Sequence, residues 1–322
     1  MRAWLKTTIA LGVTALCSFG LAAPGHAEQR IAYKSAKAGT SYYQMGVELA
    51  NAIKTGSQGG TILTVEESQG SVQNVMEAAV RQGDYVFTSP PGLVESAMEG
   101  KGPFKNRPKE SFANIRALFP IPSLTMHFVM RGDQQVDRFS DMAGKTILLG
   151  KGSFGATEGE KYIKLFGLED KIKIASAELG NAADALKNGQ IDGFVTAGSF
   201  PAPNLVEASA SMPVSLVSLT DAQIEQTGRQ KQIIPAGTYA GVDKDVATTF
   251  LPVEAFTTTA MDEQTAYLLT KTFWQQKAGL GERAPWWKAV TPEMLLKTTV
   301  KLHPGAVRYY QEAGLRIPAE MR

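Results

Sequence analysis

The sequence predicts an α/β protein with two lobes. Strand-like and helix-like segments alternate along the chain with short connections, which is typical of open, mainly parallel sheets with helices packed on them. This alternation occurs twice, in residues 30–100 and again in 146–219, and a strand-rich segment at 114–133 separates the two stretches. We therefore expect each stretch to form one lobe, with a ligand cleft where the lobes face each other.

The first stretch contains three strand–helix pairs. In order, the expected elements are strand 30–35, helix 41–55, strand 61–68, helix 71–83, strand 84–91 and helix 92–100. The first helix places Tyr43, Val47 and Ala50 at helical spacing, which predicts one packed face. Ser71 follows a glycine at the start of the second helix and is expected to be its N-cap.

The middle of the chain predicts the connection between the lobes. Two strand-like runs, 115–120 and 124–131, flank Pro120 and Pro122 with no helix between them, so we expect a crossover there. The second lobe then repeats the pattern with strand 146–150, helix 156–168, strand 171–176, helix 182–189, strand 191–198, a further helix and strand 213–219.

A segment rich in proline and glycine, 233–253, leads back to the first lobe, and the pattern is helical from residue 261 onward. The predicted division is lobe 1 at 28–120 and 242–322, including the C-terminal helices, and lobe 2 at 121–241.

The first 27 residues have the three-part layout of a secretory signal peptide. Arg2 and Lys6 come first, then a weakly apolar run, and then Gly25 and Ala27 at the positions that precede a cleavage site. An uncleaved anchor is the alternative, but the run is shorter and less apolar than the roughly 20 residues that a spanning helix needs. We expect cleavage near Ala27, a periplasmic location and no membrane insertion of the mature chain.

Charge and residue usage exclude several classes of protein. The chain has 33 basic and 31 acidic residues, and Arg2 and Lys6 leave with the signal peptide, so the mature chain is close to neutral. No basic stripe points to nucleic acid. The one cysteine lies within residues 1–27, and His127 and His303 are far apart in the sequence. We therefore expect no metal site, no catalytic thiol and no cofactor.

The segment GKGSFGATEG (150–159) matches the G-x-G-x-x-G spacing of nucleotide-binding loops. The residues that would complete a kinase, a P-loop or a dinucleotide-binding site are missing around it, and an exported protein meets little ATP or NAD. A loop before a helix still offers backbone N–H groups and the hydroxyls of Ser153 and Thr157 to an anion. We interpret the segment as a helix start that receives a carboxylate.

Six segments, in order along the chain, resemble the motifs of one receptor family. They are AGTSYYQMG (38–46), SQGSVQN (68–74), GATEGE (155–160), ALKNGQIDGFV (185–195), IIPAGTY (233–239) and LHPGAVRYYQEAGL (302–315). With these motifs the chain resembles the solute-binding subunit of TAXI-type TRAP transporters, the tripartite ATP-independent periplasmic systems. The resemblance covers nearly all of the chain after residue 27.

The resemblance implies a periplasmic-binding-protein-like fold of type II that closes on a small molecule. It implies no enzymatic activity and delivery of the ligand to an integral-membrane TRAP permease driven by an ion gradient. The ligands it implies are small organic acids, either 2-oxo acids and dicarboxylates or acidic amino acids. A binding protein for an ABC transporter or a membrane sensor is the alternative, and a secreted serine hydrolase is a remote one, since no G-x-S-x-G elbow is present.

Two segments depart from the family pattern. Residues 88–91 read Thr-Ser-Pro-Pro where members commonly have Gln-x-Asp, and 154–157 read Phe-Gly-Ala-Thr where members often have Gly-Ser-Gly-Thr. Both are expected to line the cleft.

The candidate ligand-binding residues are hydroxyl and aromatic side chains at helix starts and strand ends. They are Thr40, Ser41, Tyr43, Ser71, Thr88, Ser89, Ser153, Phe154, Thr157 and Ser199. Each charge-assisted hydrogen bond that they make to a carboxylate would contribute about 1.5–3 kcal/mol. Lys34, Lys37 and Lys151 are candidate cationic partners in loops on the cleft side, as are Arg116 and Arg131 on the crossover.

Overall fold

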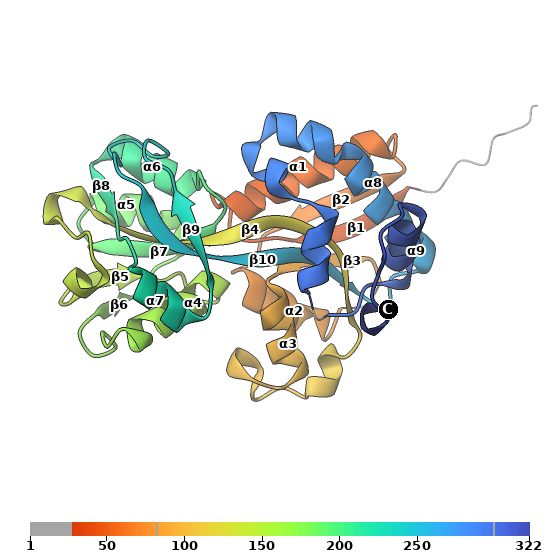
Figure 1. Ribbon diagram of the computed structural model, residues 1–322, viewed down its shortest axis with the longest axis horizontal. Coiled ribbons are helices and arrows are strands. Elements are labelled where there is room, and N and C mark those ends of the chain that lie inside the picture. The colour runs from red at the N-terminus through yellow and green to blue at the C-terminus, as the bar shows by residue number, and fades with distance from the viewer. Residues whose placement is uncertain (1–27, 82, 299) are drawn as a thin grey trace, which may run out of the picture.

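The computed structural model describes residues 28–81, 83–298 and 300–322 of the chain. The segment 1–27, for which a signal peptide is predicted, lies outside the described residues. Figure 1 shows two lobes, each with helices around strands, joined by the two long strands β4 (Ile115–Arg131) and β10 (Val246–Thr258). The predicted two-lobe α/β fold is confirmed.

The lobes contain the following elements. Lobe 1 holds β1 (Gln29–Lys34), α1 (Ser41–Gly56), β2 (Thr61–Glu66), α2 (Ser71–Ala78), β3 (Tyr85–Ser89), α3 (Pro91–Met98), α8 (Glu263–Arg283) and α9 (Pro304–Glu312). Lobe 2 holds β5 (Thr146–Leu148), α4 (Phe154–Leu165), β6 (Lys173–Ala175), α5 (Ala182–Lys187), β7 (Gly193–Gly198), α6 (Pro203–Ser211), β8 (Val214–Leu216), α7 (Asp221–Thr227) and β9 (Gln230–Ile234).

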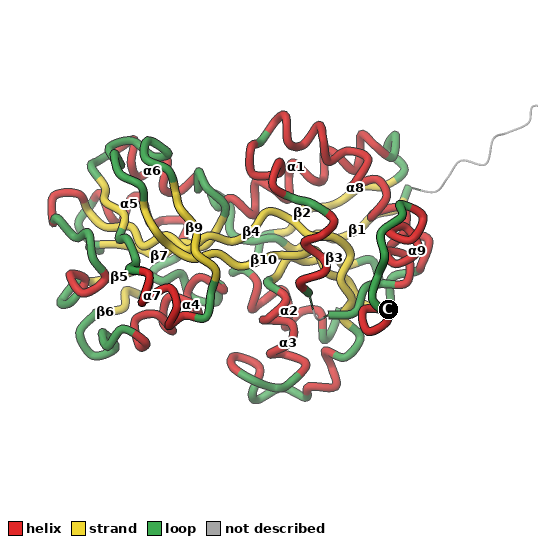
Figure 2. The backbone as a smooth tube through the Cα atoms, in the orientation of Figure 1, coloured by secondary structure: helices red, strands yellow, loops and turns green. Residues whose placement is uncertain are grey.

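The strands of both lobes form one continuous sheet. Its order is β2-β1-β3-β10-β4-β7-β5-β6, with β8 paired to β4 and β9 to β10. The pairs β1–β2, β1–β3, β5–β6 and β5–β7 are parallel, as expected for strand–helix alternation, whereas β4 and β10 pair antiparallel with their neighbours. Figure 2 shows these strands as one path through the middle of both lobes.

The predicted crossover at 115–131 is a single strand and not two. β4 continues through Pro120 and Pro122, although proline donates no hydrogen bond and is rare inside sheets. The strand tolerates both because its pairing to β7 begins only at Thr125, while its other edge pairs with β10 from residue 115 onward. The missing N–H groups therefore fall where β4 has one neighbouring strand. The predicted lobe boundary at residue 120 lies inside this strand, and the division itself stays a prediction.

Helix α1 buries a different face from the one that the spacing of Tyr43, Val47 and Ala50 predicts. Met45, Leu49 and Ile53 are buried, whereas Val47 is 40% exposed. A helix of this length can carry apolar residues on more than one face, each made of residues three or four positions apart. The Met45–Leu49–Ile53 line presents more apolar surface to the sheet and to α8, so burying it contributes more to stability.

The C-terminal segment packs against lobe 1. Phe273 of α8 stacks on Phe119 of β4 with ring centroids 4.1 Å apart. The indoles of Trp286 and Trp287 both donate to Glu48 Oε2 on α1, at 3.0 and 2.7 Å. His303 is the N-cap of α9, and its side chain accepts from the N–H of Gly305. No helix among the described residues is long and apolar enough to cross a lipid bilayer.

Candidate functional site

The starts of three helices surround a small cavity between the lobes. Helices α1 and α2 come from lobe 1 and α4 comes from lobe 2. The cavity measures about 40 Å³ as the space open to the centre of a water molecule. We call it the inner cavity, and its lining residues are Ser35, Ala36, Lys37, Thr40, Tyr42, Gln69, Gly70, Ser71, Thr88, Leu124, Gly150, Ser153, Phe154, Gly155, Leu179, Ala197 and Val253. Helix starts carry partial positive charge, so this arrangement favours an anion.

Helix α1 brings Thr40 to the inner cavity. Thr40 is the N-cap, and its hydroxyl accepts from the N–H of Tyr43 at 3.4 Å and donates to the carbonyl of Lys37 at 2.7 Å. The neighbouring aromatic in the wall is Tyr42, while Tyr43 does not line the cavity. The Tyr42 hydroxyl donates to the carbonyl of Pro122 on β4 at 2.9 Å, which fixes the ring against this strand. We call the parts of β4 and β10 that join the two lobes the hinge.

Helix α2 begins with an N-cap that has no side chain. Gly70 holds this position, so the prediction that Ser71 caps the helix is wrong. The backbone of Gly70 has a φ of +118°, which a serine there would not adopt, and a Cβ on Gly70 would lie 3.2 Å from the Cα of Ser153 in the other lobe. Ser71 becomes the first helical residue and lines the cavity together with Thr88 at the end of β3. The first turn of α2 therefore faces the cavity without a side-chain cap.

Helix α4 brings Ser153 and Phe154 to the inner cavity. Ser153 is the N-cap, with its hydroxyl 2.9 Å from the N–H of Ala156, and the helix begins two residues before the predicted start at 156. The expected helix start at GKGSFGATEG is thus confirmed as local structure. The Phe154 ring is buried and forms part of the wall, and Thr157 lies one turn further along, outside the lining of the inner cavity.

The other predicted site residues lie away from the inner cavity. The Ser89 hydroxyl is buried and donates to the carbonyl of Pro90 at 3.1 Å. The Ser199 hydroxyl donates to the carbonyl of Ser123 at 2.7 Å and faces a separate cavity, lined also by Thr125 and Phe250. Since side chains alternate along β4 and Leu124 lines the inner cavity, Ser123 and Thr125 mark the opposite face of the hinge. Sequence reasoning cannot assign Ser199 to a face without the pairing of β7 and β4.

Ser41 lies at a contact between the lobes. It is 2% exposed at the start of α1, and a Cβ on Gly198 of β7 would lie 2.2 Å from its Oγ. Lys37 crosses the same gap, with its Nζ 3.6 Å from Glu178 Oε2 of lobe 2. These contacts, together with the approach of Gly70 to Ser153, mean that the lobes are closed on each other around the inner cavity.

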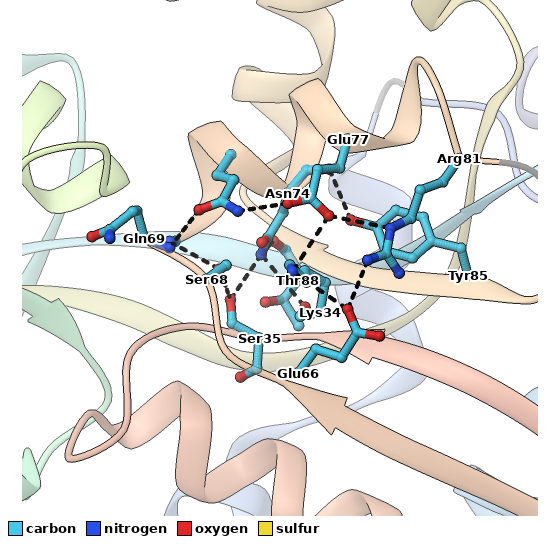
Figure 3. A network of polar contacts seen from close by, with 12 residues as sticks. Lys34, Ser35, Glu66, Ser68, Gln69, Asn74, Glu77, Arg81, Tyr85 and Thr88 are labelled. Atoms are coloured by element: carbon cyan, nitrogen blue, oxygen red, sulfur yellow. Dashed lines mark hydrogen bonds and ion pairs between the residues drawn. The ribbon is translucent and has the colours of Figure 1, made fainter.

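The expected cationic partners differ in where they lie. Lys37 lines the inner cavity, whereas Lys151 does not. Lys34 is almost fully buried, 3.3 Å from Glu66 and 3.4 Å from Glu77, and Arg81 pairs with Glu66 at 2.8 Å (Figure 3). Burial raises the pKa of Glu66, but hydrogen bonds and charge from Arg81 and Lys34 outweigh it and hold that pKa below its ordinary value. Lys34 is therefore already balanced by acids.

Arg116 and Arg131 lie at opposite ends of β4, away from the inner cavity. The guanidinium of Arg116 donates to the carbonyls of Ala113 and Ile115 at 2.9 and 2.8 Å. The guanidinium of Arg131 pairs with Asp133 at 2.8 Å. Neither side chain is among the lining residues.

Asn74 ties together two backbone segments that line the inner cavity, although it was not among the predicted site residues. Its side chain is fully buried, and its Nδ2 donates to the carbonyls of Ser35 at 2.8 Å and Thr88 at 3.1 Å (Figure 3). The Ser68 hydroxyl donates to the Ser35 carbonyl at 3.1 Å and accepts from the N–H of Gly70 at 2.9 Å. The Gly-Ser-x-x-Asn motif at 70–74 contains the information that would have identified Asn74.

His127 is a buried residue of β4. Its Nδ1 lies 3.0 Å from the Thr125 carbonyl and its Nε2 lies 3.0 Å from the Tyr239 hydroxyl. Burial lowers the pKa of His127 to about 4, so the ring is neutral at neutral pH. Within residues 28–81, 83–298 and 300–322, no three histidine, cysteine or acidic side chains gather as ligands for a metal.

Two solved structures are similar to this chain over most of its length. The periplasmic binding protein BugD is 13% identical and aligns over 90% of this chain and 99% of its own, with a TM-score of 0.59. MatC from Rhodopseudomonas palustris with bound malate is 12% identical over 88% of this chain and 97% of its own, with a TM-score of 0.56. The fold is that of the two-lobe periplasmic binding proteins. The chain belongs to the NMT1-like family, whose family model matches residues 34–314.

Proposed function

We propose that this protein is an extracytoplasmic receptor that binds a small organic acid and delivers it to a membrane transporter. One observation carries the proposal: helix starts from both lobes converge on one cavity between them that has hydroxyls and Lys37 in its wall. Fixed N–H dipoles and hydroxyl donors stabilise a carboxylate that has left water. Because both lobes contribute, a bound ligand favours the closed arrangement over an open one.

We further propose that the transporter is a TRAP permease of the TAXI type and that the mature chain is periplasmic. Six family motifs in the expected order and the predicted signal peptide at 1–27 support this, and several of the motifs contribute to the cavity. The ABC transporter and the membrane sensor remain alternatives, because each would use the same ligand chemistry.

A receptor fits the site better than a hydrolase. The hydroxyl of Ser153 caps α4 and that of Ser199 is bonded to a backbone carbonyl. The nitrogens of His303 contact the Met261 carbonyl and the Gly305 N–H, and those of His127 are also engaged, so neither ring is placed as a base beside a serine.

Ligand retention tests the proposal directly. Mature protein purified under native conditions is analysed by mass spectrometry, and isothermal titration calorimetry then measures binding of monocarboxylates, dicarboxylates, 2-oxo acids and amino acids. We expect an organic acid to co-purify or to bind with micromolar or tighter affinity. Folded protein that binds no acid of the panel would refute the proposal. Uptake into liposomes that contain a TRAP permease, driven by a sodium gradient and dependent on the receptor, distinguishes the TRAP partner from an ABC transporter.

A further inference from the structure

We propose that the inner cavity selects a compact acid with one carboxylate and a short apolar substituent, and that the Phe154 ring limits its length. This inference rests on the proposed function, because it names the ligand class of the same site.

The charges around the inner cavity favour a ligand with a single negative charge. Lys37 is the one cationic side chain among the lining residues, and no acidic side chain lines the cavity. A buried charge is costly unless it is paired, so each charged group of a ligand needs a partner in this wall. A second carboxylate would have to share Lys37, which already lies 3.6 Å from Glu178. The ammonium group of an amino acid would find no carboxylate in the wall.

The rest of the wall favours an apolar substituent. Seven of the lining residues present aliphatic or aromatic surface: Ala36, Tyr42, Leu124, Phe154, Leu179, Ala197 and Val253. Measured as the space open to the centre of a water molecule, the inner cavity has about 40 Å³, against about 550 Å³ for the larger cavity on the other side of Phe154. This is room for a short acid and not for a long one.

Phe154 separates the inner cavity from a larger one. The outer cavity, of about 550 Å³ by the same measure, lies between α3 and α4 and is lined by Pro91, Glu95, Thr157, Glu158 and Arg229 among others. Phe154 lines both cavities. Its position is well defined, because it is the first residue of α4 and follows the N-cap Ser153. Removing the ring would join the two spaces.

The acids around the outer cavity determine what it would accept. Glu158 is paired with Arg229 at 2.8 and 3.0 Å, and Glu95 lies on the opposite wall. Burial, and then the charge of Glu99, raise the pKa of Glu95. A second carboxylate entering this space would meet Glu95 and an arginine that is already paired. An extended apolar chain meets Leu251 and the prolines of the same wall.

Calorimetry with butyrate, octanoate, succinate and glutamate tests the inference on four proteins. These are the wild type, Phe154→Ala, Phe154→Leu and the control Phe166→Ala, which removes a ring from the other end of α4, where it packs on Phe139. We expect the wild type to bind butyrate at least tenfold more tightly than each of the other three acids. Phe154→Ala should reduce the preference for butyrate over octanoate at least tenfold, Phe154→Leu should reduce it less, and Phe166→Ala should keep it.

The outcomes separate the inference from the proposed function. Tighter binding of succinate or glutamate than of butyrate by the wild type overturns the inference and leaves the receptor function intact. Binding of none of the four acids, nor of any other organic acid, overturns both. If Phe154→Ala does not fold, Phe154→Leu decides, and a butyrate-to-octanoate ratio equal to that of the wild type overturns the role of the ring.

Discussion

A methyl group at Gly198 should prevent the lobes from closing fully. Gly198 ends β7 in lobe 2, and its missing Cβ would lie 2.2 Å from Ser41 Oγ and 3.5 Å from Ser41 Cβ in lobe 1. The first distance is shorter than real contacts allow, and the second is an ordinary contact. Gly198→Ala therefore introduces a clash between the lobes that depends on closure.

The size of the effect follows from the burial of Ser41. Overpacking a buried site costs about 1–3 kcal/mol, and Ser41 is 2% exposed, so its hydroxyl has little room to turn away. The strain exists only in the closed arrangement, and it therefore subtracts from the free energy of closure on the ligand. Since about 1.4 kcal/mol is a factor of ten, we expect Gly198→Ala to weaken ligand binding about 5- to 150-fold.

Calorimetry with an acid that the wild type binds measures this loss, and thermal unfolding without ligand checks that the variant folds. Ser41→Ala removes Oγ and keeps Cβ, so the double variant Gly198→Ala/Ser41→Ala should bind about as well as Ser41→Ala alone. Wild-type affinity in Gly198→Ala would refute the reasoning. So would a double variant that stays as weak as Gly198→Ala, because the hydroxyl would then not be the obstacle.

Three further changes affect stability. Gly279→Ala in the last part of α8, where a Cβ meets nothing nearer than 4.0 Å, should raise the free energy of unfolding by about 0.5–1 kcal/mol and leave ligand affinity unchanged. Lower stability of the variant would contradict this. Burial raises the pKa of Glu254 to about 8. Between pH 4.5 and 8 the folded state therefore keeps a proton on Glu254 that the unfolded chain releases, and the free energy of unfolding falls as the pH rises through this range. Glu254→Gln should therefore gain more over the wild type at pH 8 than at pH 5 in urea unfolding, and an equal gain at both would refute the assignment. Burial lowers the pKa of His127 from 6.5 to about 4, so its contribution is lost as pH falls through that window. His127→Gln should lose this slope, up to about 1.4 kcal/mol per pH unit, and a slope that persists would contradict it.

The order of elements could be predicted because each strand and helix is encoded locally. Apolar runs with flanking glycines and helical spacing mark β1 through α3 and β5 through α6 within a few residues. The helix starts at Thr40 and Ser153 were also predictable, since threonine and serine caps are local features. Thus the sequence contained most of the fold and the first residues of α1 and α2, at 41 and 71, whereas it placed the start of α4 two residues late.

The placement of side chains around the inner cavity depended on contacts that the sequence does not show. Which of Tyr42 and Tyr43 enters the wall is decided by the face of α1 that packs on the sheet, and spacing alone favoured the wrong face. Ser199 looked equivalent to the other strand ends until the antiparallel pairing of β7 with β4 placed it behind the hinge. The first residue after a turn can be either the N-cap or the first residue of the helix. The positive φ of Gly70 makes that glycine the N-cap, so Ser71 is the first helical residue.

The prolines of the two connecting strands determine which way this molecule deforms. Pro120, Pro122 and Pro252 fall in the middle of β4 and β10, next to a break in their pairing register between Leu251 and Val253. Two strands with fewer hydrogen bonds between them at this point can twist, but their covalent backbones do not stretch. The distance between the lobes along these strands is therefore fixed, and ligands of different size would change the angle between the lobes instead.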